Sequence, residues 1–135
     1  MTSINLDNTM ERTYKNDGQH AEQVFIYTLT GKIVKASNKP AKDGGDFEDI
    51  QIKSQKASIC RGTDLKAHLA EDGAKRYAYV TKDFAKAYIM DRTEYTDFIE
   101  NFGAVTRESA KNGGHEKIRL RAESQKMREW LGERA

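Results

Sequence analysis

The chain has 135 residues, enough for one domain with a modest hydrophobic core. Hydrophobic residues make up 37% and charged residues 33%, and no apolar run approaches the roughly 20 residues that a membrane span needs. The net charge of +2 does not by itself indicate a nucleic-acid partner, and the single cysteine, Cys60, excludes an internal disulfide. We therefore expect a soluble cytoplasmic protein with no secretion signal and no membrane partner.

The first elements follow from apolar spacing and from capping residues. Residues 1–15 carry no clear pattern, so we expect a flexible lead-in before a single α/β domain that spans residues 16–135. An apolar stripe from Ala21 to Leu29 predicts a helix within residues 16–31. Asn16 or Asp17 can cap this helix, and Gly31 ends it.

The remaining elements follow in chain order from period-two alternation and from helix signals. We expect strands at 32–37, 47–54, 56–60, 76–81 and 86–90, helices at 63–74, 91–103 and 123–134, and a basic strand or extended arm at 111–121. The segment at 56–60 either continues the strand before it or pairs with that strand. This order predicts an α/β (α+β) fold with a mixed central sheet flanked by helices.

The predicted core combines one face of each element. It contains Val24, Phe25, Leu29, Ile50, Ile52, Leu65, Leu69, Val80, Ile89 and Phe98, and Trp130 docks the last helix.

An acidic, glycine-containing turn precedes the strand at 47–54. Alternation along that strand turns Ile50 and Ile52 toward the core and places Asp49, Gln51 and Lys53 on the other face. Such a polar face has two interpretations. It is the solvated side of an edge strand, where lysine discourages aggregation, or it is part of a polar site.

The polar site would suit phosphodiester hydrolysis. Asp43 and Asp46 lie upstream on a loop that can fold back toward the strand. A loop carboxylate and a strand oxygen can hold a divalent cation, and a nearby lysine can steady the nucleophile or the phosphate.

These residues resemble the PD-(D/E)xK nuclease family of restriction enzymes and resolvases. "DGGDFEDIQIKS" is similar to the acidic turn and Q-x-K strand of the Mrr-like branch, and "GQHAEQ" puts Glu22 where the family's first-helix acid falls. The resemblance covers roughly residues 15–90. It implies a restriction-endonuclease-like core with the order helix–strand–strand–strand–helix–strand. It also implies Mg²⁺ or Mn²⁺ held by Glu22, Asp46 or Asp43, and Gln51, with Lys53 orienting the attacking water.

Two functions therefore stand side by side. The first is a metal-dependent nuclease that acts on DNA, with phosphate contacts from the basic arm and last helix: Lys117, Arg119, Arg121, Lys126 and Arg128. The second is a non-enzymatic protein on a nuclease-like fold that binds nucleic acid or a protein, such as a phage or mobile-element inhibitor of a host defence complex. The retained Lys53 and the clustered acids favour the first function, whereas the neutral Gln51 and the short spacing between Asp46 and Gln51 favour the second. A homodimer is compatible with both.

Overall fold

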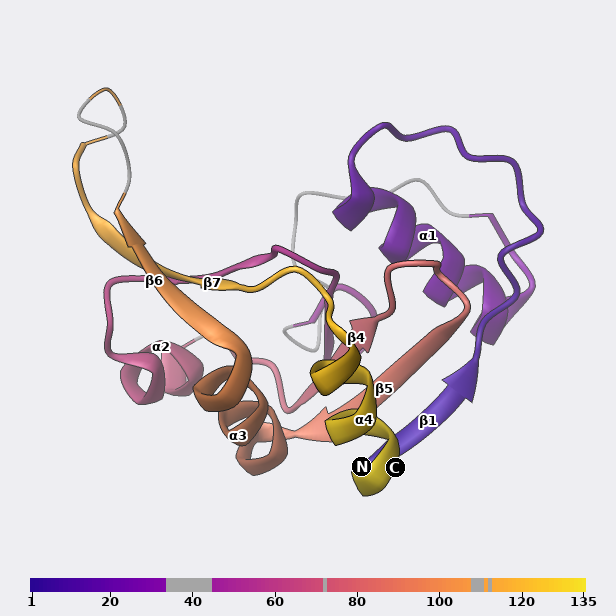
Figure 1. The fold of residues 1–135 in the computed structure, drawn as a ribbon. Helices are drawn as coiled ribbons and strands as arrows, with labels where there is room; N and C mark the ends of the chain where they lie inside the picture. Colours follow the sequence, from indigo (N-terminus) through magenta and orange to yellow (C-terminus); the bar gives the residue numbers. More distant parts are fainter. Residues whose placement is uncertain (34–44, 72, 108–110, 112) are drawn as a thin grey trace.

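The computed structural model describes residues 1–33, 45–71, 73–107, 111 and 113–135. Over these residues the chain is a mixed α+β fold with two sheets and four helices, and its two ends lie close together (Figure 1). The elements in chain order are β1 (Thr2–Asn5), α1 (Asp17–Thr30), β2 (Ile50–Lys53), β3 (Ser58–Arg61), α2 (Leu65–Glu71), β4 (Arg76–Val80), β5 (Lys86–Asp91), α3 (Arg92–Phe102), β6 (Gly103–Arg107), β7 (Glu116–Leu120) and α4 (Gln125–Arg134).

The larger sheet is mixed, as the sequence predicts. Its strand order is β1-β5-β4-β2, so β2 is an edge strand. β2 runs parallel to β4, whereas β4, β5 and β1 pair in antiparallel fashion. The parallel pair is joined through α2, the crossover that parallel neighbours require. The smaller sheet, β3-β7-β6, is antiparallel, and its β6–β7 ribbon projects from the body of the protein (Figure 1).

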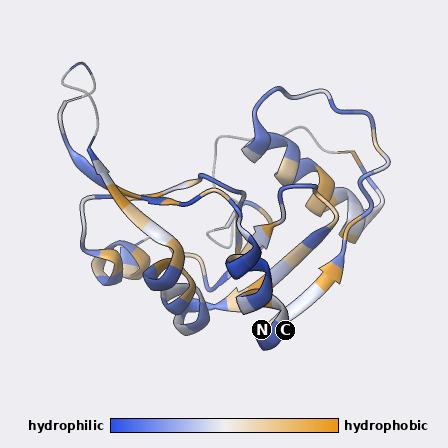
Figure 2. Cartoon of the chain, viewed as in Figure 1, coloured by the Kyte–Doolittle hydropathy of each residue, from blue (hydrophilic) through white to orange (hydrophobic). Residues whose placement is uncertain are grey.

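The larger sheet has a hydrophobic cluster on each face because successive side chains of a strand point to opposite sides. Ala78 and Val80 of β4 pack with Val24 and Phe25 of α1. Tyr77 and Tyr79 belong to the other cluster, together with residues of α2, α3 and α4. Figure 2 shows hydrophobic residues on the central strands and on the helices beside them, and mixed hydrophilic and hydrophobic residues along the projecting ribbon. The sheet is therefore covered on both faces.

Helix α1 begins and ends as its sequence predicts. The Asn16 side chain accepts hydrogen bonds from the backbone N–H groups of Gly18 and Gln19. Gly31 ends the helix in the left-handed conformation, with φ of 70°, which glycine adopts without strain.

Most of the predicted core is confirmed. The prediction that Leu29 is buried is wrong, since 46% of its surface is exposed, and Ile89 is only partly buried. The buried residues of α1 lie between His20 and Phe25, so the last turn extends past the sheet. The residues confirmed as buried are Val24, Phe25, Ile50, Ile52, Leu65, Leu69, Val80 and Phe98. Trp130 docks α4 by packing on Phe98 and Phe102, at ring-centroid distances of 5.8 and 5.7 Å.

Other expectations are corrected by long-range pairing. The start of the chain is not a poorly ordered lead-in, because Thr2–Asn5 form an edge strand against β5. Strand β6 was not expected from the sequence, since its pattern is short and weakly apolar. The segment at 56–60 neither continues β2 nor pairs with it; Ser58–Arg61 pair with β7 in the second sheet. Of the strand expected at 32–37, residues 34–37 lie outside the described part, and residues 32 and 33 are not in a strand.

No helix among the described residues is both long enough and apolar enough to cross a membrane.

Candidate functional site

A very tight turn leads into β2. Phe47 and Ile50 form an antiparallel bridge with hydrogen bonds in both directions, Phe47 N–H to Ile50 O at 3.1 Å and Ile50 N–H to Phe47 O at 2.9 Å. Glu48 sits in the left-handed region with φ of 52°. A Cβ on Gly45 would lie 2.5 Å from the backbone of Ile50, so only glycine fits there. Asp46 and Gln51 are close together in the sequence. The turn nevertheless brings Asp46 beside β2, because it folds residues 45–47 back against that strand.

Asp46 is held against β2 by this turn. Its Oδ2 accepts a hydrogen bond of 2.7 Å from the backbone N–H of Ile52. Because β2 is an edge strand, the carboxylate takes the place of a neighbouring strand at that N–H. The loop carboxylate is thus fixed beside β2.

Glu22 lies next to Asp46, although 24 positions separate them in the chain. Helix α1 presents Glu22 from the face that packs on Ile50 and Ile52. Burial raises the pKa of Glu22 to about 8, and the charge of Asp46 and a hydrogen bond between the two side chains act in the same direction. Lys53 opposes this rise, so its ammonium group lies within electrostatic reach. Glu22 therefore keeps its proton at neutral pH, and the structure joins three of the predicted site residues.

This carboxyl pair makes stability depend on pH. The pKa of Glu22 is about 8 in the folded chain against an ordinary value of 4.5, so the folded state carries a proton that the unfolded state lacks between those pH values. The free energy of unfolding should therefore fall as pH rises from about 5 to 8. Partial exposure of Glu22 limits the expected loss to about 2 kcal/mol.

Urea unfolding in EDTA at pH 5.5 and 8.5 measures this effect. Glu22→Gln removes the titration, so the variant should gain stability over the wild type as pH rises. Glu100→Gln, at an exposed position on α3, serves as the control and should follow the wild type. A difference between wild type and Glu22→Gln that stays constant with pH would contradict the raised pKa of Glu22.

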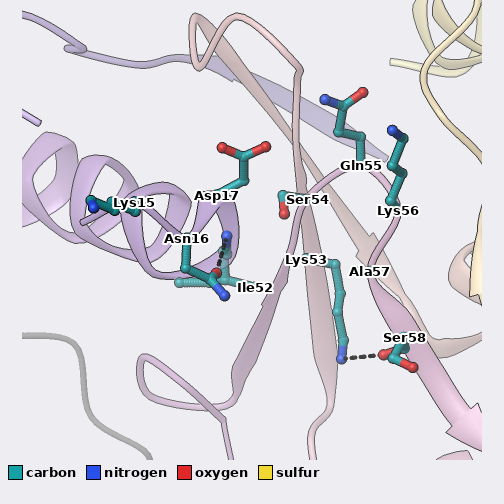
Figure 3. Close-up of a pocket in the computed structure, with 11 residues that line it drawn as sticks. Lys15, Asn16, Asp17, Ile52, Lys53, Ser54, Gln55, Lys56, Ala57 and Ser58 are labelled. Carbon is teal, nitrogen blue, oxygen red and sulfur yellow. Dashed lines mark hydrogen bonds between the residues drawn. The ribbon is translucent and has the colours of Figure 1, made fainter.

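Lys53 lies between two hollows of the surface. Its Nζ donates a hydrogen bond of 3.3 Å to the backbone carbonyl of Ser58, as Figure 3 shows. The larger hollow, of about 510 Å³, lies between the N-terminus of α1 and residues 52–58. Among the described residues, Lys15, Lys53 and Lys56 line it together with one acid, Asp17, and the helix N-terminus adds positive potential.

Gln51 shares the second hollow, of about 200 Å³, with Lys53. The side chains of Gln51 and Lys53 alternate with those of the buried Ile50 and Ile52, which confirms the predicted strand for residues 50–53. Residues 47–49 form the turn instead. Lys53 lines this hollow and also lies within electrostatic reach of the carboxyl pair.

His68 of α2 also lines the second hollow, and the sequence gave no reason to select it. The other histidines, His20 and His115, are distant from it in the chain. The parallel pairing of β2 with β4 through α2 brings it there. A β-α-β crossover downstream of the Q-x-K strand is the only signal that could have found it.

Asp49 does not belong to this site. It lies in the turn before β2, and its carboxylate accepts a hydrogen bond of 2.7 Å from Nη2 of Arg76. Hydrogen bonding to the Arg76 side chain lowers the pKa of Asp49. The backbone carbonyl of Asp49 also accepts hydrogen bonds from the backbone N–H groups of Lys75 and Arg76. Asp49 therefore ties the turn to β4, and the expectation that it faces the same way as Gln51 and Lys53 is wrong. Asp43, the other predicted loop ligand, lies outside the described residues.

The available ligand groups suit a Mg²⁺ site in which the protein supplies only a few of the ligands. Within the described residues, no group of three or more histidine, cysteine, aspartate or glutamate side chains is placed to hold a metal. Glu22 and Asp46 form a carboxyl pair, and Gln51 offers a neutral amide oxygen. Mg²⁺ is commonly held by one or two carboxylates with water and substrate phosphate completing its shell. A dication would also relieve the repulsion by Asp46 that helps to raise the pKa of Glu22.

The predicted nucleic-acid contacts fall into two groups. Lys117 and Arg119 lie on β7, and Arg121 follows that strand. Lys126 and Arg128 lie on α4, where Arg128 is 3.5 Å from Glu123. The Glu123 carboxylate also accepts a hydrogen bond from Tyr79, so Arg128 takes part in docking α4 to the sheet.

No protein-family model matches this chain, and neither the curated proteins nor the solved structures contain a match.

Proposed function

We propose that this protein is a metal-dependent nuclease that hydrolyses phosphodiester bonds in DNA. The observation that carries the proposal is the carboxyl pair of Glu22 and Asp46 with Lys53 in electrostatic reach. These residues come from a helix, a turn and a strand, in the order of the PD-(D/E)xK resemblance. Charge repulsion between buried carboxylates destabilises a fold, so a pair kept at this cost is a functional-site candidate.

Each residue has a distinct role in this proposal. Glu22, Asp46 and the amide oxygen of Gln51 would hold Mg²⁺ or Mn²⁺. The bound ion would supply charge neutralisation at the phosphate and lower the pKa of a water. Lys53 orients the attacking water and stabilises the charge that develops on the phosphate oxygens. The cationic hollow beside Lys53 accepts a neighbouring phosphate of the same strand.

The topology supports a restriction-endonuclease-like core in part. Helix α1, strand β2, helix α2 and the parallel strand β4 follow the family's order around its active site. The chain departs from that order at β3, which joins the second sheet instead of the central one. Most of the strand expected before β2, at 32–37, lies outside the described part of the chain.

A plasmid-nicking assay tests the proposal. Purified protein with Mg²⁺ or Mn²⁺ should convert supercoiled plasmid to the open circular form, and EDTA should stop the reaction. Catalysis at neutral pH requires the proton on Glu22 to leave when the ion binds, so nicking should be faster at pH 8.5 than at pH 6.5. No cleavage with either ion, at any pH in this range, would contradict the nuclease.

Gln51 favours a second candidate. A neutral amide is a weaker ligand for a hard cation than the acid usual at this position of the family. A non-enzymatic protein that binds nucleic acid or a protein complex, as a phage or mobile-element inhibitor of host defence would, fits the same fold. In that case no divalent ion supports nicking, whereas salt-sensitive binding through Arg119 and Arg121 persists.

A further inference from the structure

The smaller sheet has one strongly basic face. Cross-strand partners in an antiparallel sheet lie on the same side, so the register places Arg61 of β3 beside Lys117 of β7, and Arg119 one step further along. We call Arg61, Lys117 and Arg119 the basic face. The positions next to it, on β6 and β3, are the small residues Ala104, Thr106 and Ser58.

Part of the opposite side of this sheet belongs to the core. Ile118 and Leu120 alternate with the basic residues along β7, and both pack in the cluster that contains Phe98. Val105, the register partner of Ile118 on β6, is 58% exposed, so the core covers this side at β7 and leaves it open at β6. Small neighbours leave room for a large ligand to approach the long basic side chains.

The basic face begins beside the candidate active site. Lys53 donates to the carbonyl of Ser58, and Ser58 is the register partner of Arg119. From Arg119 the next cation on the same face is two residues along β7, about 7 Å away. The cations thus lead from Lys53 outward along the ribbon that projects from the body (Figure 1). A polymer with regularly spaced negative charges is the ligand that this arrangement fits.

Duplex DNA fits it better than a single strand. Proteins that bind single strands without sequence preference stack the bases on exposed aromatic rings. Among the described residues, the large hydrophobic side chains that are exposed are Leu29, Ile33 and Val105, and none is aromatic. Contacts to phosphates alone read the backbone, which a duplex presents while its bases stay paired.

We propose that the basic face binds the sugar-phosphate backbone of duplex DNA on one side of the bond that is cleaved. This inference rests on the proposed function, since it takes Lys53 as the position of the reacting phosphate. The face makes the enzyme select double-stranded substrate and holds the flanking duplex while Lys53 meets the reacting phosphate.

Binding in EDTA tests the proposal without relying on cleavage. Fluorescence anisotropy would compare a labelled 20-base-pair duplex with a single strand that carries the same number of phosphates. The wild type should bind the duplex about 10-fold more tightly at 100 mM salt. Replacing Arg61, Lys117 and Arg119 together by alanine should weaken duplex binding about 10- to 100-fold and make the plot of log K against log salt shallower by nearly 3 units.

A matched triple variant controls for net charge. Lys66→Ala, Lys82→Ala and Lys86→Ala remove the same charge from exposed positions on α2, the β4–β5 turn and β5. This variant should keep most of the duplex affinity and the wild-type salt slope. Circular dichroism and urea unfolding of both variants separate a binding defect from a folding defect. If the triple variant of the basic face is unfolded, the single variant Arg119→Ala replaces it, and the slope of log K against log salt should then change by about 1.

Two outcomes would overturn the inference: equal loss of affinity in the two triple variants, or single-strand binding as tight as duplex binding. These results differ from failure of the proposed function. A wild type that binds duplex DNA through the basic face but never nicks plasmid would contradict the nuclease and leave the DNA-binding surface in place.

Discussion

Lys53→Met should reduce plasmid nicking by about 10²- to 10³-fold, the loss expected when one charged group that stabilises the transition state is removed. Methionine keeps an unbranched apolar stem of similar length but has no ammonium group. The effect is large because Lys53 borders both hollows and lies within electrostatic reach of the carboxyl pair. Initial rates with saturating Mn²⁺ measure it.

Lys56 provides the matched control for this prediction. It lines the same 510 Å³ hollow as Lys53 but is an exposed residue in the turn after β2. Lys56→Met should lower the rate only a few-fold, through weaker phosphate attraction. Nicking that survives Lys53→Met unchanged would show that a contaminating nuclease causes it.

Asp46→Asn gives a second and independent test of the same site. Replacement by alanine would leave the N–H of Ile52 without its partner and would mix a structural defect with a catalytic one. Asparagine keeps an oxygen that accepts this hydrogen bond and removes only the charge. Loss of nicking with a urea midpoint no lower than that of the wild type is the expected result, since the change also removes the repulsion of Glu22.

Phe25→Ala should lower the free energy of unfolding by about 3–5 kcal/mol, the cost of truncating a well-packed aromatic residue. Phe25 has no exposed surface and packs in the cluster with Ile50 and Ile52. Its ring meets that of Phe47 edge to face, at a centroid distance of 6.4 Å. The substitution therefore leaves a cavity between α1 and the turn that holds Asp46.

Leu29→Ala, on the same helix, is the control. Its side chain is 46% exposed, so the change should cost less than about 1 kcal/mol. Urea unfolding measures both variants. A loss below about 1 kcal/mol for Phe25→Ala would mean that α1 is not anchored where the structure places it. Because Glu22 lies one turn before Phe25, the stable packing of this helix is also what positions the carboxyl pair.

Local pattern alone was sufficient for much of the fold. A helix cap at Asn16 and a stop at Gly31 bound α1, and the alternation of Ile50 and Ile52 with Gln51 and Lys53 predicts β2 and its two faces. These features were readable because capping bonds and side-chain alternation depend on neighbours within a few residues. The same alternation also predicted that Gln51 and Lys53 share one side.

Strand partners could not be read in this way. Thr2–Asn5 and Gly103–Arg107 are strands because β5 and β7 lie beside them, and their own composition gives little sign of it. Ser58–Arg61 were expected next to β2 but pair with β7, more than 50 positions further along the chain. Pairing over such separations depends on the packing of the whole sheet and not on local propensity.

In the candidate site, too, some features follow from the local sequence and others depend on long-range packing. The sequence by itself determined the chemical identity of Glu22, Asp46, Gln51 and Lys53 and their order along the chain. It could not decide that Asp46 reaches the N–H of Ile52, because that contact depends on a turn tightened by Gly45 and by the left-handed Glu48. Only the packing of α1 on β2 decided that Glu22 and Asp46 meet and that the pKa of Glu22 rises, since side-chain distances across elements are set by the core between them.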